Sequence, residues 1–448
     1  MNIAQLYLTS HILNIDKPRC DVEVNIEIGN HSSLYVNMKH FLDKARDKLR
    51  QEMSGDGHQG GGYPAQYQSQ QSMAPPPPDQ QASGADADVL HVSQGAIDMF
   101  FLSKQDNGEI GGIGYWQTAN GYTAVTLYDF WSRTNRNRSV IEDQIKRVMH
   151  HHHNLINEFN DDTLWWAQCC MAMYDLTSSP HYLDTAISIW AHVHRSVMRP
   201  GAHRVADKDM GGGVFWTTKP DEDALNTITT GLFAELSALL ACVPPNSHSR
   251  LPPHADLLSS ARTSLDWIVR CRYRPHEAIA TDTIHLRTGE CVDWTFTYNT
   301  GQLLAACSAL YTASHDHAYI ALGSDIVRAS LTREGWVDHE GILTEAGAYG
   351  PEKHKAHENN DAVGFKSVLL RALAKFYIVL RKFDLDSALA EQIAAFVRRN
   401  YRAVTTKDTN GRHQYGPWWN GPMDLPTSHS QMAVLDVFAA VVAVGGPS

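Results

Sequence analysis

The sequence has little positive charge and no long apolar run. Lysine and arginine number 38 against 49 aspartates and glutamates, so the formal net charge is -11 at pH 7. Without a basic block, the chain offers no electrostatic footprint for nucleic acid or an anionic lipid surface. The apolar stretch MAVLDVFAAVVAVGG near the C-terminus is too short to span a membrane and contains Asp436. We therefore expect no nucleic-acid partner and no transmembrane segment.

Cysteine is also scarce and dispersed. The seven cysteines form no Cys-x-x-Cys pair and none of the spacings that bind zinc. The consecutive histidines His150 to His153 point in different directions on a helix, so they do not form a closed coordination shell. The N-terminus, MNIAQLYLTSHILNIDKPRC, lacks the basic, apolar and cleavage regions of a secretory signal. We expect no metal, no cofactor and, from this N-terminus, no export.

The first 88 residues differ in composition from the rest of the chain. Residues 54–88 are rich in Gly, Gln, Pro and Ser and too poor in apolar residues to offset the entropy of ordering, which predicts a disordered linker. Residues 1–53 contain a strand-like DVEVNIEI and a helix-like MKHFLDKARDKLRQEM, but few apolar positions. We expect an N-terminal appendage with at most partial order over residues 1–53 and one large domain over residues 89–448.

The large domain has an almost entirely helical pattern. Some segments, such as DDTLWWAQCCMAMYDL, are apolar or small nearly all the way round, which is typical of helices buried on every side. They alternate with segments such as HYLDTAISIWAHVHRSV that have one apolar face. Six inner and six outer helices predict six helical hairpins closed in a ring, an all-α (α/α)6 toroid. The expected helices lie near residues 93–104, 114–131, 138–154, 161–176, 181–196, 222–242, 255–272, 297–313, 317–331, 362–380, 385–402 and 428–443.

Polar and aromatic residues stand where the inner helices are expected to begin. The inner helices of such a ring run parallel, so their first turns open on one face. Capping explains any single polar residue there, because Asn, Asp, Ser and Thr side chains satisfy the free N–H groups of a first turn. Together they predict a binding cleft. The candidates are Trp116, Gln117, Asn120, Asn160, Asp161, Asp162, Trp165, Trp166, Asp223, Asn226, Trp294, Tyr298, Asn299, Asp361, Phe365, Lys366, Ser428 and His429.

The adjacent pair Asp161 and Asp162 exceeds what capping needs. Mutual repulsion and burial beside two tryptophans raise a carboxyl pKa, whereas a helix N-terminus lowers one. Opposed effects can divide the pair into an ionised carboxylate and a protonated acid, which are the two groups a glycosidase uses. Adjacent side chains can place their carboxyl groups roughly 5 to 6 Å apart, which favours a retaining over an inverting mechanism.

Five blocks of sequence in this order carry a family resemblance: NDDTLWWAQCCMAMYDLT, GGGVFWTT, ALNTITTGLFAELSALLA, FTYNTGQLLAACSALYTAS and GFKSVLLRALAKFY. Over roughly residues 93–445 the chain resembles glycoside hydrolase family 76, the fungal and bacterial α-1,6-mannanases, and in particular its fungal branch. The resemblance implies an (α/α)6 fold and endo-acting hydrolysis of α-1,6-linked mannan with retention, without a metal. It also implies that Asp161 is the nucleophile and Asp162 the acid/base. Positions that line the family's cleft and its aromatic walls are matched by Asn226, Tyr298, Asn299, Trp116 and Trp216.

The sequence departs from the family pattern at three positions. Thr230 stands where the family often has Asn, Thr300 where it often has Gln, and Phe159 where it often has Tyr. These departures predict altered sugar subsites. The resemblance also implies a secreted or wall-associated protein, although the first 88 residues stand where a signal peptide is usual.

Two alternatives to hydrolysis stay open. A cell-wall transglycosidase acting on mannan or on glycans of the glycosylphosphatidylinositol type uses the same carboxylates but passes the glycosyl unit to a sugar. A noncatalytic glycan-binding toroid keeps the fold without the activity. The expected partner is α-mannan or a mannooligosaccharide in each case, and the protein is expected to be a monomer.

Overall fold

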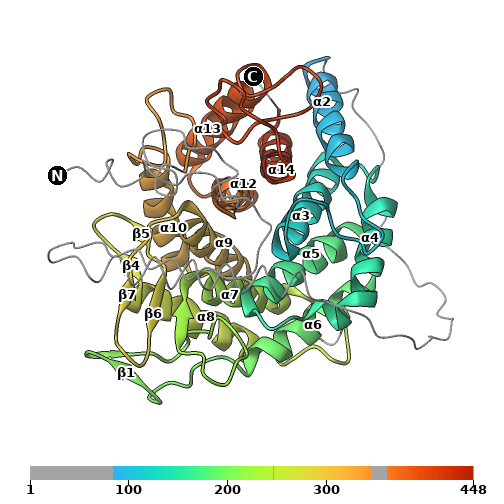
Figure 1. Ribbon diagram of the computed structural model, residues 1–448. Helices are drawn as coiled ribbons and strands as arrows, with labels where there is room; N and C mark the ends of the chain where they lie inside the picture. The colour runs from blue at the N-terminus through green and yellow to red at the C-terminus, as the bar shows by residue number, and fades with distance from the viewer. Residues whose placement is uncertain (1–83, 246, 346–360, 447–448) are drawn as a thin grey trace, which may run out of the picture. The chain divides into compact units, whose positions relative to one another are not determined.

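A computed structural model describes residues 84–245, 247–345 and 361–446 of the chain (Figure 1). The expected appendage, residues 1–53, lies outside these residues, as does most of the expected linker. Helix α2 begins at Gly84, so residues 84–88 belong to a helix and not to the linker. Val89 is buried in the hydrophobic core, which attaches the start of this helix to the domain.

The described residues form twelve α-helices, and each corresponds to one expected segment. The segment expected at 222–242 starts late as a helix, because its first residues pair with a strand instead. The helices are α2 (Gly84–Phe101), α3 (Tyr115–Ser132), α4 (Arg138–His151), α5 (Asn160–Thr177), α6 (Pro180–His194), α7 (Thr227–Cys242), α8 (His254–Cys271), α9 (Thr297–Ser314), α10 (His317–Ser330), α12 (Phe365–Lys382), α13 (Ser387–Thr406) and α14 (Ser428–Ala443), with 3-10 turns η2 (His153–Leu155) and η4 (Asp361–Gly364).

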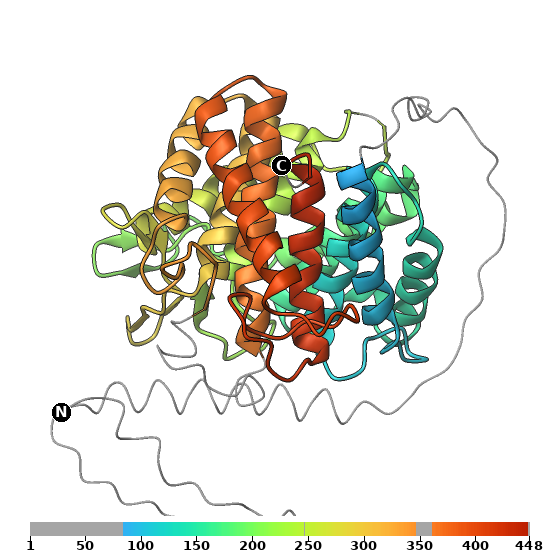
Figure 2. The same cartoon turned by 90° about the horizontal axis from the view of Figure 1, so that it is seen from above.

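Six helices form an inner ring. Helix α3 packs on α5, α5 on α7, α7 on α9, α9 on α12 and α12 on α14, and α14 packs back on α3 to close the circle (Figure 1). The other six described helices lie outside this ring. Each packs against at least one inner helix and runs alongside it, as Figure 2 shows. The expected toroid of six helical hairpins is therefore confirmed.

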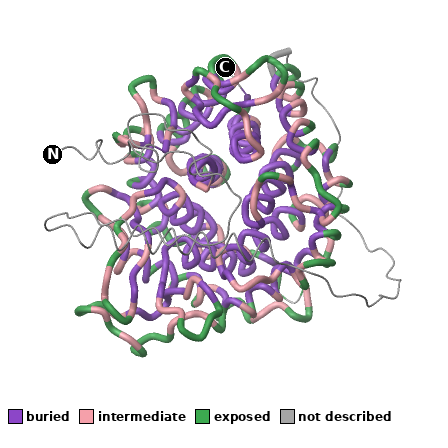
Figure 3. Tube along the Cα trace, viewed as in Figure 1, coloured by how far each residue is buried: buried purple, intermediate pink, exposed green. Residues whose placement is uncertain are grey.

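Burial separates the two kinds of helix. Inner helix α7 buries 14 of its 16 residues, whereas outer helix α4 buries only 4 of its 14. Figure 3 shows the same contrast, with buried residues concentrated in the inner ring and exposed residues on the periphery. The alternation of uniformly apolar and one-faced segments in the sequence therefore has the predicted cause.

A buried ion pair joins the last inner helices to the first. Arg371 of α12 donates from Nε and Nη2 to the Asp436 carboxylate of α14, at 2.7 and 2.8 Å. Its Nη1 donates to Asn120 Oδ1 of α3 at 2.8 Å, and Asn120 Nδ2 donates to the Trp116 carbonyl. Asn120 is 1% exposed. The expectation that Asn120 contacts sugar is therefore corrected: both polar atoms of its amide are bonded inside the protein, one turn below the helix entrance.

Short strands lie in the loops between hairpins. The antiparallel order β3-β6-β7 places Asn226 opposite Thr283, and the Thr227 amide donates to the Asp282 carbonyl at 3.1 Å. The GGG turn packs closely on α8: a Cβ on Gly212, which has φ +95°, would lie 2.2 Å from the Thr263 carbonyl oxygen. The strands are β1 (Arg204–Val205), β2 (Lys208–Asp209), β3 (Ala224–Asn226), β4 (Tyr273–Arg274), β5 (Ile279–Ala280), β6 (Thr283–His285) and β7 (Cys291–Val292).

Candidate active site

The first turns of the inner helices meet at one face of the ring, which we call the mouth. Trp116 of α3 stacks on Trp165 of α5, with ring centroids 6.1 Å apart. Tyr298 of α9 stacks on Phe365 of α12 at 4.3 Å. The indole of Trp116 also donates to Asp361 Oδ1 at 3.3 Å. Four expected helix entrances are thus brought together, and Trp165, which is 4% exposed, lies behind Trp116 as a wall.

The two adjacent aspartates occupy the first turn of α5, and neither is its N-cap residue, which is Phe159. Asp161 is half-buried; its Oδ2 accepts from the Trp216 indole at 3.0 Å and its Oδ1 from the Asp162 backbone N–H at 2.9 Å. Asp162 is 1% exposed and its Oδ2 accepts from the Asn157 side-chain amide at 3.1 Å. The neighbouring carboxyl groups therefore differ in burial and in their hydrogen-bond donors.

The charges of the two aspartates affect the pKa values of different tyrosines. Burial raises the pKa of Tyr115 well above its usual value, and the charge of Asp162 adds to the effect. Burial likewise raises the pKa of Tyr298, with the carboxylates Asp282, Asp161 and Asp361 adding to it. The charge of Asp162 thus acts on Tyr115 of α3, and the charge of Asp161 acts on Tyr298 of α9. The Tyr298 hydroxyl remains protonated and can donate a hydrogen bond.

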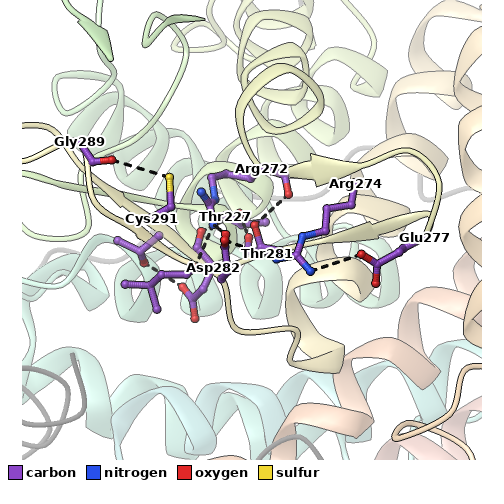
Figure 4. A network of polar contacts seen from close by, with 11 residues as sticks. Thr227, Arg272, Arg274, Glu277, Thr281, Asp282, Gly289 and Cys291 are labelled. Carbon is purple, nitrogen blue, oxygen red and sulfur yellow. Dashed lines mark hydrogen bonds and ion pairs between the residues drawn. The ribbon is translucent and has the colours of Figure 1, made fainter. Parts of the chain in front are cut away.

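Asp282 is a carboxylate at the mouth that sequence reasoning missed. It accepts from the Tyr298 hydroxyl at 3.3 Å and from the Thr283 hydroxyl at 2.9 Å, and burial raises its pKa. Figure 4 shows Asp282 beside Thr227 and Thr281, just after the hairpin of β4 and β5. Asn299, buried in the first turn of α9, lies close enough to lower this pKa in part. No helix start marks Asp282, because it belongs to a short loop between β5 and β6.

Two asparagines have structural bonds that qualify their expected role as sugar contacts. Asn226 caps α7, since its Oδ1 accepts from the Thr229 N–H at 3.0 Å. Asn160 is fully buried; its Nδ2 donates to the Phe215 carbonyl at 2.9 Å and its backbone N–H to the Trp216 carbonyl at 2.8 Å. Asn160 therefore holds the loop that presents Trp216 beside Asp161.

Lys366 and Asp361 lie near each other in sequence but face different surroundings. Lys366 is 1% exposed, and its Nζ donates to the Val363 and Pro417 carbonyls, both at 3.0 Å. The expectation that Lys366 binds substrate is therefore corrected: the side chain of this second residue of α12 points into the protein. Asp361 is half-buried at the mouth and accepts from the Gln117 amide at 2.7 Å.

Two of the departures from the family pattern, Thr230 and Thr300, make hydrogen bonds to loops around the mouth. The Thr230 hydroxyl accepts from the Val214 N–H at 3.0 Å, in the loop that carries Trp216. The Thr300 hydroxyl accepts from the Ala280 N–H at 2.9 Å, in the hairpin that carries Asp282. Both threonines are fully buried. Each threonine therefore anchors a loop at the mouth through a buried hydrogen bond.

The described residues offer neither a metal-binding cluster nor a membrane-spanning helix. None of their His, Cys, Asp and Glu side chains gather in groups of three or more that could hold a metal ion. Within the run of histidines, His152 Nε2 lies 3.4 Å from Glu109 Oε1, and its ring packs against Tyr115 with the two planes tilted by 41°. No helix in this part of the chain is long and apolar enough to cross a membrane.

Comparisons with known proteins agree with this architecture. The sequence model of glycosyl hydrolase family 76 matches residues 86–446. The α-1,6-mannanase GH76A from Salegentibacter sp. HEL1_6 is 19% identical with a TM-score of 0.66, over 80% of this chain and 99% of that chain. Dfg5 from Chaetomium thermophilum, solved in complex with glucosamine, is 17% identical with a TM-score of 0.64, over 81% of this chain and 92% of that chain. Mannan endo-1,6-alpha-mannosidase DFG5 from Candida albicans is 24% identical over 239 residues, 49% of this chain and about half the length (50%) of that relative.

Proposed function

Because this chain belongs to glycosyl hydrolase family 76, we propose that it hydrolyses α-1,6-mannosidic linkages within mannan chains and retains the anomeric configuration. The observation that carries the proposal is the pair of adjacent carboxyl groups in the first turn of α5, one half-buried and bonded to the Trp216 indole, the other buried. Two carboxyl groups in unlike surroundings are what a double displacement at an anomeric carbon requires.

Asp161 is the proposed nucleophile. N–H donors from Trp216 and from the backbone of Asp162 bind its two oxygens, and both favour the ionised carboxylate. In the first step an Asp161 oxygen bonds the anomeric carbon while the glycosidic C–O bond breaks, and Asp162 gives its proton to the departing oxygen. In the second step Asp162 takes a proton from water, the water oxygen bonds the anomeric carbon, and Asp161 is released.

The aromatic side chains around the aspartates would hold the mannose rings. Trp216 donates to Asp161, Trp116 stacks on Trp165 in the same helix as the pair, and Tyr298 and Phe365 form a second stacked pair. Such faces pack against the apolar side of a sugar, while carboxylates and amides bind its hydroxyl groups. The Salegentibacter mannanase supports the proposal: a variant with two consecutive aspartates replaced by asparagine is inactive and was solved with α-1,6-mannotriose. We also propose, from the family resemblance alone, that the protein acts in or near a cell wall.

Single substitutions test the two roles. Asp161→Asn and Asp162→Asn should each lower the release of reducing ends from unbranched α-1,6-mannan by a factor of about 1,000 or more, since each removes one chemical step. The matched control is Asp175→Asn, which changes an exposed carboxylate in the last turn of the same helix and should keep the wild-type rate. Near wild-type rates in either mouth variant would disprove the role assigned to that residue.

Transfer to a sugar acceptor is the second candidate function. Asp282 and Asp361 give the mouth two carboxylates beyond the catalytic pair, and an acceptor sugar bearing an amine would complement them. Dfg5 from Chaetomium thermophilum, solved with glucosamine, supports this candidate. Incubating the protein with mannan and a fluorescent glucosamine-containing acceptor distinguishes the two: labelled products in excess of free reducing ends favour transfer. Binding of mannotriose without any turnover would instead favour a noncatalytic glycan-binding toroid.

A further inference from the structure

Helix α9 begins without a capping side chain of its own. Its N-cap position is Phe296, which has no polar atom, and no side-chain cap bond is made there. Glu345, in the loop that follows α10, supplies what Phe296 lacks. Its carboxylate accepts from the Thr297 backbone N–H at 3.1 Å and, through the other oxygen, from the Thr297 hydroxyl. A residue 48 positions along the chain therefore caps this inner helix.

The burial of Glu345 requires compensation. Glu345 is only 1% exposed, and a carboxylate buried without a compensating partner is strongly disfavoured. The positive end of the α9 dipole and the two bonds from Thr297 favour the carboxylate. The buried ammonium of Lys366 in α12 adds an opposite charge, and Lys366 is itself held by two carbonyl oxygens and by the Trp419 ring at 4.9 Å. The positive charge of Lys366, in the first turn of α12, thus favours the ionised form of Glu345.

The capped turn carries two residues that the proposed function assigns to sugar binding. Tyr298 and Asn299 directly follow Thr297, and the Tyr298 hydroxyl donates to Asp282. We propose that Glu345 is a positioning residue of the mouth, which fixes Tyr298 and Asn299 by capping α9 from another loop. This inference rests on the proposed function only for the identity of the sugar, because the cap itself is independent of turnover.

The charge state of Glu345 gives the proposal a pH signature. Burial raises the pKa of Glu345 to about 7, whereas its bonds to Thr297 and the charge of Lys366 act against the rise. Burial lowers the pKa of Lys366 to about 8, against the charges of Glu345 and Asp408. Protonation of Glu345 below about pH 7 removes the charge from the cap. A glutamine at position 345 resembles that protonated form. Its amide oxygen can accept from the Thr297 N–H, and its NH2 group can donate to the Thr297 hydroxyl.

Hydrogen exchange measures the cap directly in the full chain. Glu345→Ala should speed exchange of a peptide covering residues 297–304 about tenfold, whereas Glu345→Gln and Thr297→Val, which each keep part of the cap, should speed it by less. The matched control is Asp386→Ala, which removes the side-chain cap of outer helix α13 and should change exchange only at the start of α13. Unchanged exchange at 297–304 in Glu345→Ala, or an equal increase throughout the ring, would overturn the proposal.

A binding measurement links the cap to the sugar. In the Asp161→Asn background, Glu345→Ala should weaken α-1,6-mannotriose binding about tenfold at pH 8, and Glu345→Gln should weaken it several-fold less. At pH 8 the protein that keeps Glu345 should bind mannotriose more tightly than the protein with Glu345→Gln. The ratio of the two affinities should fall toward one as the pH drops below 7. A ratio independent of pH would contradict the positioning role. If no mannotriose binds to any protein, the proposed function fails, and the exchange result still decides whether the cap exists.

Discussion

Removing the Asp436 carboxylate should destabilise the ring strongly. The side chains of Arg371 and Asp436 are 4% and 1% exposed and share two N–H···O bonds. Asp436→Ala leaves a guanidinium buried without its counter-charge, which costs about 3 to 5 kcal/mol. Because domains unfold with only about 5 to 15 kcal/mol, this is a large part of the total stability. We expect a clearly lower urea midpoint with an unchanged slope.

Two control proteins separate this explanation from general damage to the fold. Arg371→Met combined with Asp436→Leu should recover most of the loss, because apolar residues of similar volume often replace a buried pair without cost. Glu142→Ala breaks the exposed pair with Arg138 on α4 and should cost less than about 1 kcal/mol. A loss below about 1 kcal/mol for Asp436→Ala, or no recovery in the double variant, would refute the role of the pair in closing the ring.

Further expected outcomes concern the mouth and its surroundings. Thr230→Val should cost about 1 to 3 kcal/mol in urea unfolding and lower mannanase activity, because it leaves a backbone N–H of the Trp216 loop unbonded; unchanged stability would argue against this anchor. Burial lowers the pKa of His429 to about 4 from 6.5, so the folded protein binds fewer protons than the unfolded chain between these values and loses stability as the pH falls through them. His429→Gln should remove this pH-dependent loss in the free energy of unfolding, which amounts to up to about 3 kcal/mol. If the variant and the wild type lost stability identically with falling pH, the role of His429 would be contradicted. Asn137 begins an Asn-x-Ser triplet but is 3% exposed, so mass spectrometry of protein expressed through a secretory pathway should find it unglycosylated; a glycan there would contradict its placement.

The ring was predictable because its signal is local. An inner helix such as α7 buries residues on every side, so its sequence reads as uniformly apolar, and an outer helix such as α4 carries a polar face. The same argument located the mouth, since parallel inner helices must begin on one side. What composition could not reveal is the direction of each side chain. Asn120 comes four residues after Trp116 and so lies one turn, about 6 Å, below the entrance.

The missed residues depend on contacts between segments far apart in the sequence. Asp282 reaches the mouth from the short loop between β5 and β6, and Glu345 caps a helix that begins 48 residues before it. Lys366 stands at a helix start, as expected, but the helix is buried all round, so periodicity does not show that its side chain points away from the mouth. These positions follow from packing, which a single sequence expresses only indirectly.

The stereochemistry of the first product tests the proposed mechanism most directly. Unbranched α-1,6-mannan is mixed with the purified full-length protein, and proton NMR follows the anomeric signals of the new reducing ends from the first minutes. The double displacement by Asp161 and Asp162 predicts that the α-anomer forms first and then equilibrates with the β-anomer. If the β-anomer formed first, Asp161 would not be a nucleophile, and if no reducing ends formed at all, the protein would not be a mannan hydrolase.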